Sequence, residues 1–233
     1  MTSTGFAAIC GEITTTASVN YQEIVRKTIR EIGYTSSDIG FDADTCAVMI
    51  ALDRQSPDIA MGVNSALEKR NEEGADLETG AGDQGVMFGY ACNETSRMLP
   101  LPFVLATEAI QLLQQEHHPE LLPDAKSQVT FDYKRNRIDT FLISTQHQEN
   151  VDLVDVKLIC ARIMIKIADA YGLNTDFRFL INPTGRFVTG GSFADSGVTG
   201  RKIIADTYGG MCRHGGGAFS GKDPTKVDRS AAY

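Results

Sequence analysis

The stretch FLISTQHQENVDLVDVKLICARIMIKIADAYGLNTDFRFLINP, residues 141 to 183, contains a complete unit of secondary structure. Its first part, FLISTQ, bears Thr and looks extended, and its last part, FRFLINP, reads as a second strand. Between them, residues 151 to 172 place apolar residues at the spacing of a long amphipathic helix that ends at Gly172. The stretch therefore predicts a strand, a helix and another strand in succession.

A similar order occurs near the N-terminus. Residues 13 to 17 are rich in Thr and look extended, and CAVMIAL, residues 46 to 52, reads as a buried strand. Between them lies one helical stripe, ended by Gly33 and formed by Tyr21, Ile24, Val25, Ile29 and Ile32. We therefore expect an α/β (α+β) fold built from repeated strand-helix-strand units.

The connection between the two units includes a long polar loop, Gln55 to Thr79, a glycine turn, GAGDQG, and a helix through residues 107 to 115. A loop of this length in a compact domain is usually a lid, a binding loop or disordered.

Composition excludes several classes of protein. The chain has 233 residues, 42% of them hydrophobic, and no run approaches the roughly 20 apolar residues of a membrane span. The net charge of −8 argues against nucleic acid as a partner. The start lacks the basic flank of a secretion signal, so we expect a cytoplasmic protein without a membrane partner. Five scattered cysteines favour neither disulfides nor zinc, and we expect them to be reduced and buried.

The C-terminal segment differs from the rest of the chain. From Thr184 to Tyr233 there are seven Lys or Arg against four Asp, and 11 of the 22 glycines lie there. Backbone N–H groups and cations together suit a small polyanion, although a glycine-rich loop with solvated charges is an equally good explanation from composition alone.

One part of this segment, GGGAFSGKDPTKVDRS, resembles a phosphate-binding P-loop because Gly216, Gly221 and Lys222 fit G-x-x-x-x-G-K. However, Asp223 stands where Ser or Thr should bind magnesium, and no hydrophobic strand precedes the loop. We reject the P-loop. Asp223 before Pro224 instead predicts an N-cap and the first position of a helix that the sequence leaves unfinished.

Two long segments, GAGDQGVMFGY (residues 80 to 90) and GGGAFSGKD (residues 215 to 223), resemble the signatures of S-adenosylmethionine synthases, also called methionine adenosyltransferases. GEITTTA, QSPDI, PDAKSQVT, INPTGRFV, TGRKIIADTYGG and KVDRSAAY resemble other family segments in the same order. The resemblance covers essentially the whole chain. It implies three related domains about a pseudo-threefold axis, here residues 1–75, 76–188 and 189–233, the first lacking its start and the third truncated.

The resemblance implies that ATP and L-methionine form S-adenosylmethionine, that the triphosphate is cleaved to phosphate and diphosphate, that Mg²⁺ and K⁺ are cofactors, and that homodimers or dimers of dimers build the site. The implied catalytic residues are Lys126, Arg201, Lys222 and Lys226. The implied ATP contacts are Asp124, Lys126, Arg186, Phe187, Asp195, Arg201, Lys202, Ala218 and Lys222. The implied methionine contacts are Glu12, Gln55, Asp83, Asp195 and Lys226, with Asp228 facing magnesium.

From the residues alone, most of these positions have ordinary explanations: lone lysines are usually surface residues, Asp83 fits a tight turn, and Glu12 fits a solvent-facing strand edge. Asp124 and Lys126 stand just before an expected strand, where binding loops are common.

The sequence also departs from the family pattern. It lacks the N-terminal G-H-P-D-K motif, which in the family supplies a phosphate contact and a magnesium ligand, and Ser196 replaces the common Cys. We therefore expect little product from this chain alone, and an alternative is a catalytically deficient nucleotide-binding or regulatory subunit. A third, weaker alternative is an unrelated P-loop phosphotransferase, against which Asp223 and Pro224 argue.

Overall fold

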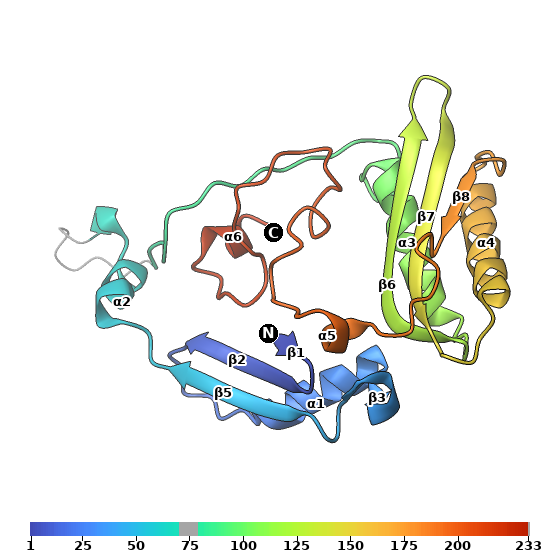
Figure 1. Cartoon of the computed structure of the whole chain (residues 1–233). Coiled ribbons are helices and arrows are strands. Elements are labelled where there is room, and N and C mark those ends of the chain that lie inside the picture. The colour runs from blue at the N-terminus through green and yellow to red at the C-terminus, as the bar shows by residue number, and fades with distance from the viewer. Residues whose placement is uncertain (70–78, 233) are drawn as a thin grey trace.

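A computed structural model describes residues 1–69 and 79–232. Figure 1 shows an N-terminal sheet with a helix, a central sheet with two long helices, and a mostly irregular C-terminal segment between them. The elements of the N-terminal part are β1 (Thr2–Ser3), β2 (Phe6–Glu12), α1 (Tyr21–Ile32), β3 (Thr35–Ser36), β4 (Phe41–Asp42), β5 (Ala47–Asp53) and α2 (Pro57–Asn64), with short 3-10 turns at Ser37–Ile39 and Leu67–Lys69. Those that follow are α3 (Leu101–Gln115), β6 (Leu121–Asp132), β7 (Arg137–His147), α4 (Leu153–Ala170), β8 (Arg178–Ile181), α5 (Gly191–Ala194) and α6 (Val227–Ser230).

The first strand-helix-strand unit consists of β2, α1 and β5. The two strands pair in parallel from Phe6 opposite Ala47 to Glu12 opposite Asp53, and α1 forms the crossover between them. Asn20 caps the helix by accepting the Glu23 N–H, and Gly33 ends it in the left-handed conformation. The predicted unit is confirmed, with a small core around Ala7, Ile29 and Phe41.

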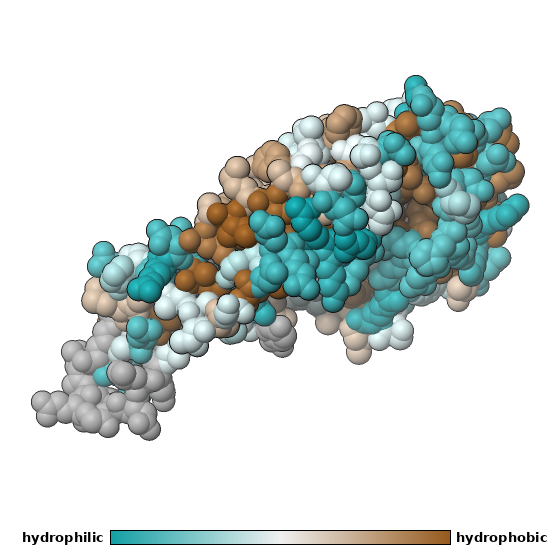
Figure 2. Space-filling view, turned by 90° about the horizontal axis from the view of Figure 1, so that it is seen from below, coloured by the Kyte–Doolittle hydropathy of each residue, from teal (hydrophilic) through white to brown (hydrophobic). Residues whose placement is uncertain are grey.

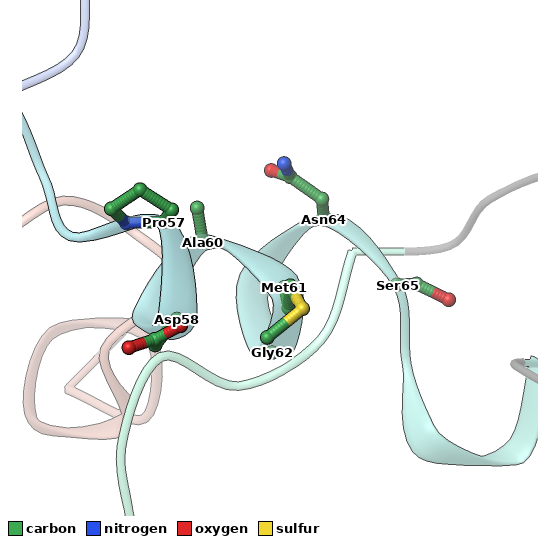
Figure 3. Close-up of a pocket in the computed structure, with 7 residues that line it drawn as sticks. All are labelled: Pro57, Asp58, Ala60, Met61, Gly62, Asn64 and Ser65. Atoms are coloured by element: carbon green, nitrogen blue, oxygen red, sulfur yellow. The ribbon is translucent and has the colours of Figure 1, made fainter.

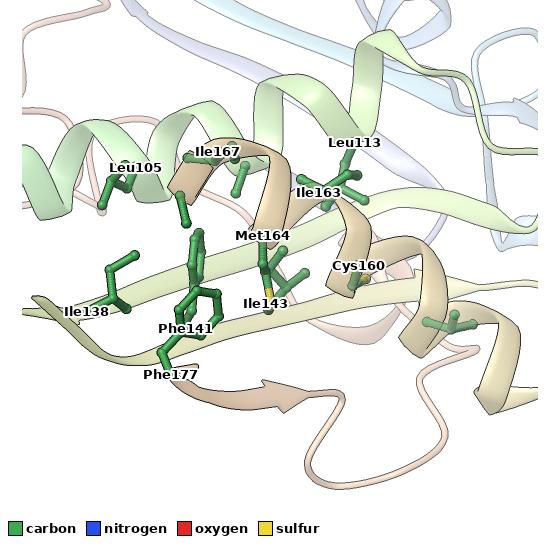
Figure 4. Packing of buried hydrophobic residues seen from close by; sticks show 13 residues of the cluster. Leu105, Leu113, Ile138, Phe141, Ile143, Cys160, Ile163, Met164, Ile167 and Phe177 are labelled. Atoms are coloured by element: carbon green, nitrogen blue, oxygen red, sulfur yellow. The ribbon is translucent and has the colours of Figure 1, made fainter. Parts of the chain in front are cut away.

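The second unit consists of β7, α4 and β8, with β6 added antiparallel to β7. Helices α3 and α4 pack on one face of this sheet, as Figure 4 shows. The core between them contains Leu105, Phe141, Ile143, Ile163 and Met164, all essentially buried. The repeated strand-helix-strand architecture predicted from the sequence is therefore confirmed.

Several boundaries differ from the sequence predictions. The first strand is Phe6–Glu12 rather than residues 13 to 17, because the parallel ladder with β5 ends at Glu12. Helix α3 begins at Leu101, directly after Pro100, and not near residue 107. Of the predicted loop from Gln55 to Thr79, residues 57 to 64 form α2, whose Ser56 cap accepts the Asp58 N–H. Residues 70 to 78 of that loop lie outside the described residues.

The C-terminal segment contains the short helices α5 and α6, and within residues 189–232 the structure has no strand. The predicted N-cap at Asp223 is wrong. The Asp223 carboxylate accepts the Thr225 N–H at 2.8 Å in a local turn, and helix α6 begins only after Lys226, whose extended backbone interrupts any helix from Pro224.

The cysteine prediction is only partly correct. All five cysteines are free, and Cys46 and Cys160 are buried, but Cys10 is exposed and Cys92 and Cys212 are half-buried. No helix in the described residues combines the length and apolar character that crossing a bilayer requires.

Candidate functional site

A cavity of about 450 Å³ lies on the face of the central sheet that is opposite α3 and α4. We call it the sheet pocket. Strand alternation explains its lining: Phe141 and Ile143 point into the core, so Leu142 and Ser144 point the other way. The register places Lys126 opposite Ser144 and thus on the pocket side. The lining residues are Lys126, Ser127, Gln128, Leu142, Ser144, Asn182, Pro183, Thr184, Arg186 and Phe187.

Two of the predicted ATP contacts in this pocket, Arg186 and Phe187, sit on the turn after β8. Asn182 fixes the start of the turn: its side chain accepts the Thr145 N–H at 2.8 Å and donates to the Thr145 carbonyl at 2.9 Å. The His147 ring fixes the end, since Nε2 accepts the Phe187 N–H at 3.1 Å and Nδ1 faces the Gln148 carbonyl at 2.8 Å.

Asn182 and His147 are not among the residues predicted from the sequence. An Asn before Pro is a turn signal and could have indicated the first, but nothing in the local pattern indicates the second.

The two cations of the sheet pocket differ in their partners. Arg186 forms an ion pair with Glu149 near the surface. The Lys126 side chain is exposed, and its ammonium group makes no hydrogen bond or ion pair with any described residue. The pocket therefore presents one ammonium group without such a partner and one exposed guanidinium group that is paired with a carboxylate, which suits an anionic ligand.

Asp124 occupies a different position from the one expected. It lies within β6 rather than before a strand, and its carboxylate accepts the Gly191 N–H at 2.8 Å. Burial, together with the negative charge of Asp124, raises the pKa of the Tyr34 hydroxyl. A Cβ on Gly191 would lie 2.3 Å from the Tyr34 hydroxyl oxygen, so the three residues are closely packed. Asp124 thus joins the central sheet to the N-terminal part and the C-terminal segment.

A second group of predicted residues gathers around α6, and we call Gly82, Gly217, Lys222, Lys226 and Asp228 the loop cluster. Lys222 Nζ lies 2.8 Å from Asp228 Oδ2, and Lys226 Nζ donates to the Gly82 carbonyl at 2.8 Å. A Cβ on Gly217 would lie 2.0 Å from Asp228 Oδ1, so only glycine allows this approach. The two signature segments, far apart in sequence, therefore meet in one structural unit.

The remaining predicted contacts lie on loops and at the end of a strand. Asp195, Arg201 and Lys202 are exposed, and a Cβ on Gly200 would lie 2.2 Å from the Ala218 Cβ, which brings their loop against the glycine loop. The other three are exposed or half-buried: Asp83, whose carboxylate accepts the Gln84 N–H at 2.8 Å, Glu12 at the end of β2, and Gln55, whose N–H lies 3.4 Å from Thr14 Oγ1.

The sheet pocket and the loop cluster remain separate. No hydrogen bond or ion pair within residues 1–69 and 79–232 links Lys126, Arg186 or Phe187 to the loop cluster, and Figure 1 shows α6 apart from β6. Both groups have the chemistry to bind phosphate. Neither holds a preformed metal site, because no three His, Cys, Asp or Glu side chains gather among the described residues.

A concave surface along α2 is a weaker candidate. Figure 3 shows Met61, Asn64 and Asp58 at this surface, which follows one helix. It has no cationic side chain, so it lacks the charge that a polyphosphate requires.

Comparison with known proteins assigns the chain to one family over almost its full length. Residues 1–57 match the N-terminal domain of S-adenosylmethionine synthetase, residues 78–187 its central domain, and residues 189–233 its C-terminal domain.

Two curated relatives, each named S-adenosylmethionine synthase, are 53% identical to the chain. The relative from Picosynechococcus sp. aligns over 253 positions that include 100% of this chain and 61% of its own length. The relative from Acaryochloris marina aligns over 251 positions that include 99% of this chain and 60% of its own length. The chain thus spans about three fifths of the length of these relatives.

Proposed function

The chain belongs to the S-adenosylmethionine synthetase family, and from this premise we propose that it serves the synthesis of S-adenosyl-L-methionine from ATP and L-methionine, with release of phosphate and diphosphate. The observation that carries the proposal is the sheet pocket, where the unpaired Lys126 and the turn that holds Arg186 and Phe187 face one cavity. These are three of the residues that the family motifs associate with ATP.

The bond-forming step needs little from an acid or a base. The methionine sulfur attacks C5′ of the ribose, the C5′–O bond breaks, and triphosphate leaves with the bonding electrons. One water molecule then hydrolyses the triphosphate to phosphate and diphosphate. A thioether has no proton to lose, so catalysis consists of orienting the two substrates and stabilising the charge on the leaving triphosphate. Ammonium and guanidinium groups placed at the triphosphate supply that stabilisation.

We assign the triphosphate to the cations of both groups, which are separate within one chain and which two copies in the proposed homodimer would supply together. Lys126 and Arg186 bind it from the sheet pocket, and Lys222, Arg201 and Lys202 approach from the C-terminal segment. Lys222 is paired with Asp228, so in this proposal ATP binding exchanges a carboxylate partner for a phosphate. In this proposal Phe187 packs on the adenosine, Asp124 and Ala218 border it, and methionine lies near Glu12, Gln55, Asp83, Asp195 and Lys226.

In this proposal, magnesium binds together with the phosphates of the substrate. Mg²⁺ often binds through one or two carboxylates together with substrate phosphates, and Asp228 offers one carboxylate of that kind. When bound, Mg²⁺ supplies charge neutralisation at the triphosphate. K⁺ is proposed from the family resemblance, and the described residues present no cluster of acidic side chains for it.

A homodimer, or a dimer of dimers, is the proposed assembly. One face of the N-terminal sheet carries small or apolar side chains that nothing in the described chain covers: Cys10, Ala47, Met49 and Ala51. Charge on this face is confined to Glu12 and Asp53, at the strand ends. Figure 2 looks from the side on which this sheet lies in Figure 1, and hydrophobic residues gather in the middle of that view. A second copy of the same face is chemically the best match for such a surface.

The test combines ATP binding with product detection. The chain is titrated with ATP and Mg²⁺, and mixtures with ATP and methionine are searched for S-adenosylmethionine by mass spectrometry. Lys126→Ala should weaken ATP binding to this chain, and in the complete enzyme it should lower turnover on the order of 100-fold, because a cation at the leaving group is lost.

The matched control for this variant is Lys134→Ala, which removes an exposed lysine from the turn between the same two strands. Equal ATP binding by the wild type and the Lys126→Ala variant would contradict the role of the sheet pocket. ATP binding without any product would favour the nucleotide-binding subunit over the enzyme.

A further inference from the structure

The glycine loop, residues 215 to 219, is packed tightly from two sides. A Cβ on Gly215 would lie 1.7 Å from the Val86 carbonyl oxygen, and one on Gly217 would lie 2.0 Å from Asp228 Oδ1. These distances leave no room for a side chain at either residue. The loop is thus held between the 79–90 segment and helix α6, but these contacts do not fix its middle residue.

His214 makes the contact that fixes the middle residue of the glycine loop, Gly216. Its Nδ1 accepts the Gly216 N–H at 2.7 Å, and its ring lies edge-on to Phe219, with centroids 5.2 Å apart and planes at 67°. Gly216 has φ +100°, which other residues rarely adopt, so its amide direction depends on this bond. The His214 ring therefore contacts the loop at its middle residue, Gly216, and at its last residue, Phe219.

The hydrogen bond also defines the state of the ring. Because Nδ1 accepts, a neutral imidazole carries its proton on Nε2. Nε2 is buried and has no partner among the described residues. The ring acts here through Nδ1 alone, so its contribution is to the position of the loop.

The backbone amides of the glycine loop differ in whether they make a hydrogen bond. The Gly216 N–H is occupied, whereas the N–H groups of Gly215, Gly217 and Ala218 make no hydrogen bond in the part of the chain that the structure describes. Backbone amides left free in such a loop are natural donors to phosphate.

We propose that His214 is a positioning residue. Its neutral ring accepts the Gly216 N–H and packs against Phe219, so that the loop presents its remaining amides to the triphosphate. This rests on the proposed function, because the ligand is the triphosphate of ATP. His214 itself does not touch the substrate.

Three substitutions separate this role from a general effect on folding. In His214→Asn, the side-chain oxygen stands close to the place of Nδ1 and can still accept the Gly216 N–H. In His214→Gln, the amide corresponds instead to the place of Nε2. His214→Ala removes both groups, and His117→Asn, at an exposed histidine away from the loop, is the control.

The first measurement is hydrogen exchange of the Gly216 amide in the purified chain without ligand. Loss of one hydrogen bond should speed exchange about tenfold in the Ala and Gln variants, and the Asn variant should restore it within about threefold. Unchanged exchange in the Ala variant, or an Asn variant as fast as Ala, would overturn the proposal.

The second measurement is the dissociation constant for ATP with Mg²⁺. It should rise about tenfold in the Ala and Gln variants and stay close to wild type in the Asn variant, while methionine binding changes less than twofold. Equal losses for both substrates would indicate a general effect and contradict the proposal. If the wild type fails to bind ATP, the proposed function fails, whereas the exchange measurement still decides the role of His214 in the loop.

Discussion

Lys222 and Asp228 form an ion pair within the loop cluster. The two side chains neutralise each other at 2.8 Å, and both are largely withdrawn from solvent. A partly buried lysine without such a partner would be costly, so the pair stabilises the loop. In the proposed function a phosphate replaces the carboxylate. The sequence indicates both residues through their motif, but it does not indicate that they bind each other.

Individual cysteines are predicted to react very differently. Burial raises the pKa of the Cys160 thiol to about 12, whereas Cys10 is exposed on β2. Because the thiolate is the reactive form, iodoacetamide at pH 8 should leave Cys160 unmodified in the native chain, and it should label Cys10 first in the monomer, since Cys10 lies on the face that the proposed dimer would cover. Peptide mass spectrometry after short labelling times measures this, with a urea-unfolded sample as the control. Rapid native labelling of Cys160 would show that its surroundings open readily.

The raised pKa of the Cys160 thiol also determines how stability changes with pH. Its pKa in the folded chain lies above the ordinary value of 9.0, so its contribution to the free energy of unfolding is complete below about pH 9 and is lost as the pH rises toward 12. Burial also raises the pKa of Tyr34, whose effect has the same sign.

At the scale of the element, α1 and α4 were predictable because each carries a clear apolar stripe and an end signal. Helix α6 was not predictable, although Asp223 and Pro224 form a good start signal. The Asp223 carboxylate is satisfied by Thr225 within the turn, and that bond competes with capping. Local signals therefore located the long elements, whereas the short one depends on contacts that Lys226 makes with Gly82, 144 residues away.

Helix α4 offers a matched test of which face is buried. Ile163 is 1% exposed in the core against α3 and the sheet, and Ile165, two residues later, is 37% exposed. Ile163→Ala should lower the free energy of unfolding by about 2–5 kcal/mol, because it removes packed atoms and leaves a cavity. Ile165→Ala should cost much less. Urea unfolding followed by circular dichroism measures both variants, and similar losses would contradict the packing described for α4.

For the whole molecule, the sequence predicts the repeated units and indicates candidate site residues, but it does not predict how those residues are distributed in space. Lys126 and Arg186 share a pocket because register and a turn bring them there, while Lys222 and Lys226 lie in a separate unit. Distances between motifs that are remote in sequence depend on tertiary packing, for which local patterns carry little information. His147 and His214 show the same limit, since each acts through one backbone amide.

The proposed dimer makes a prediction about the N-terminal sheet. Met49 is 60% exposed on the uncovered face of β5, among alanines and Cys10. Met49→Glu would place a charge in the centre of this face, and burying it against a second copy without a partner costs several kcal/mol. Light scattering after size exclusion should therefore show a dimer for the wild type and a monomer for Met49→Glu at micromolar concentrations.

The control is Leu158→Glu, which places the same charge on the outer surface of α4, where Leu158 is 50% exposed. It should leave the dimer intact, because the central helices take no part in the proposed contact. A wild-type monomer at all concentrations, or a dimer that both variants preserve, would remove the sheet face as the interface. If only Met49→Glu dissociates, the uncovered strands β2 and β5 are the surface through which two copies associate.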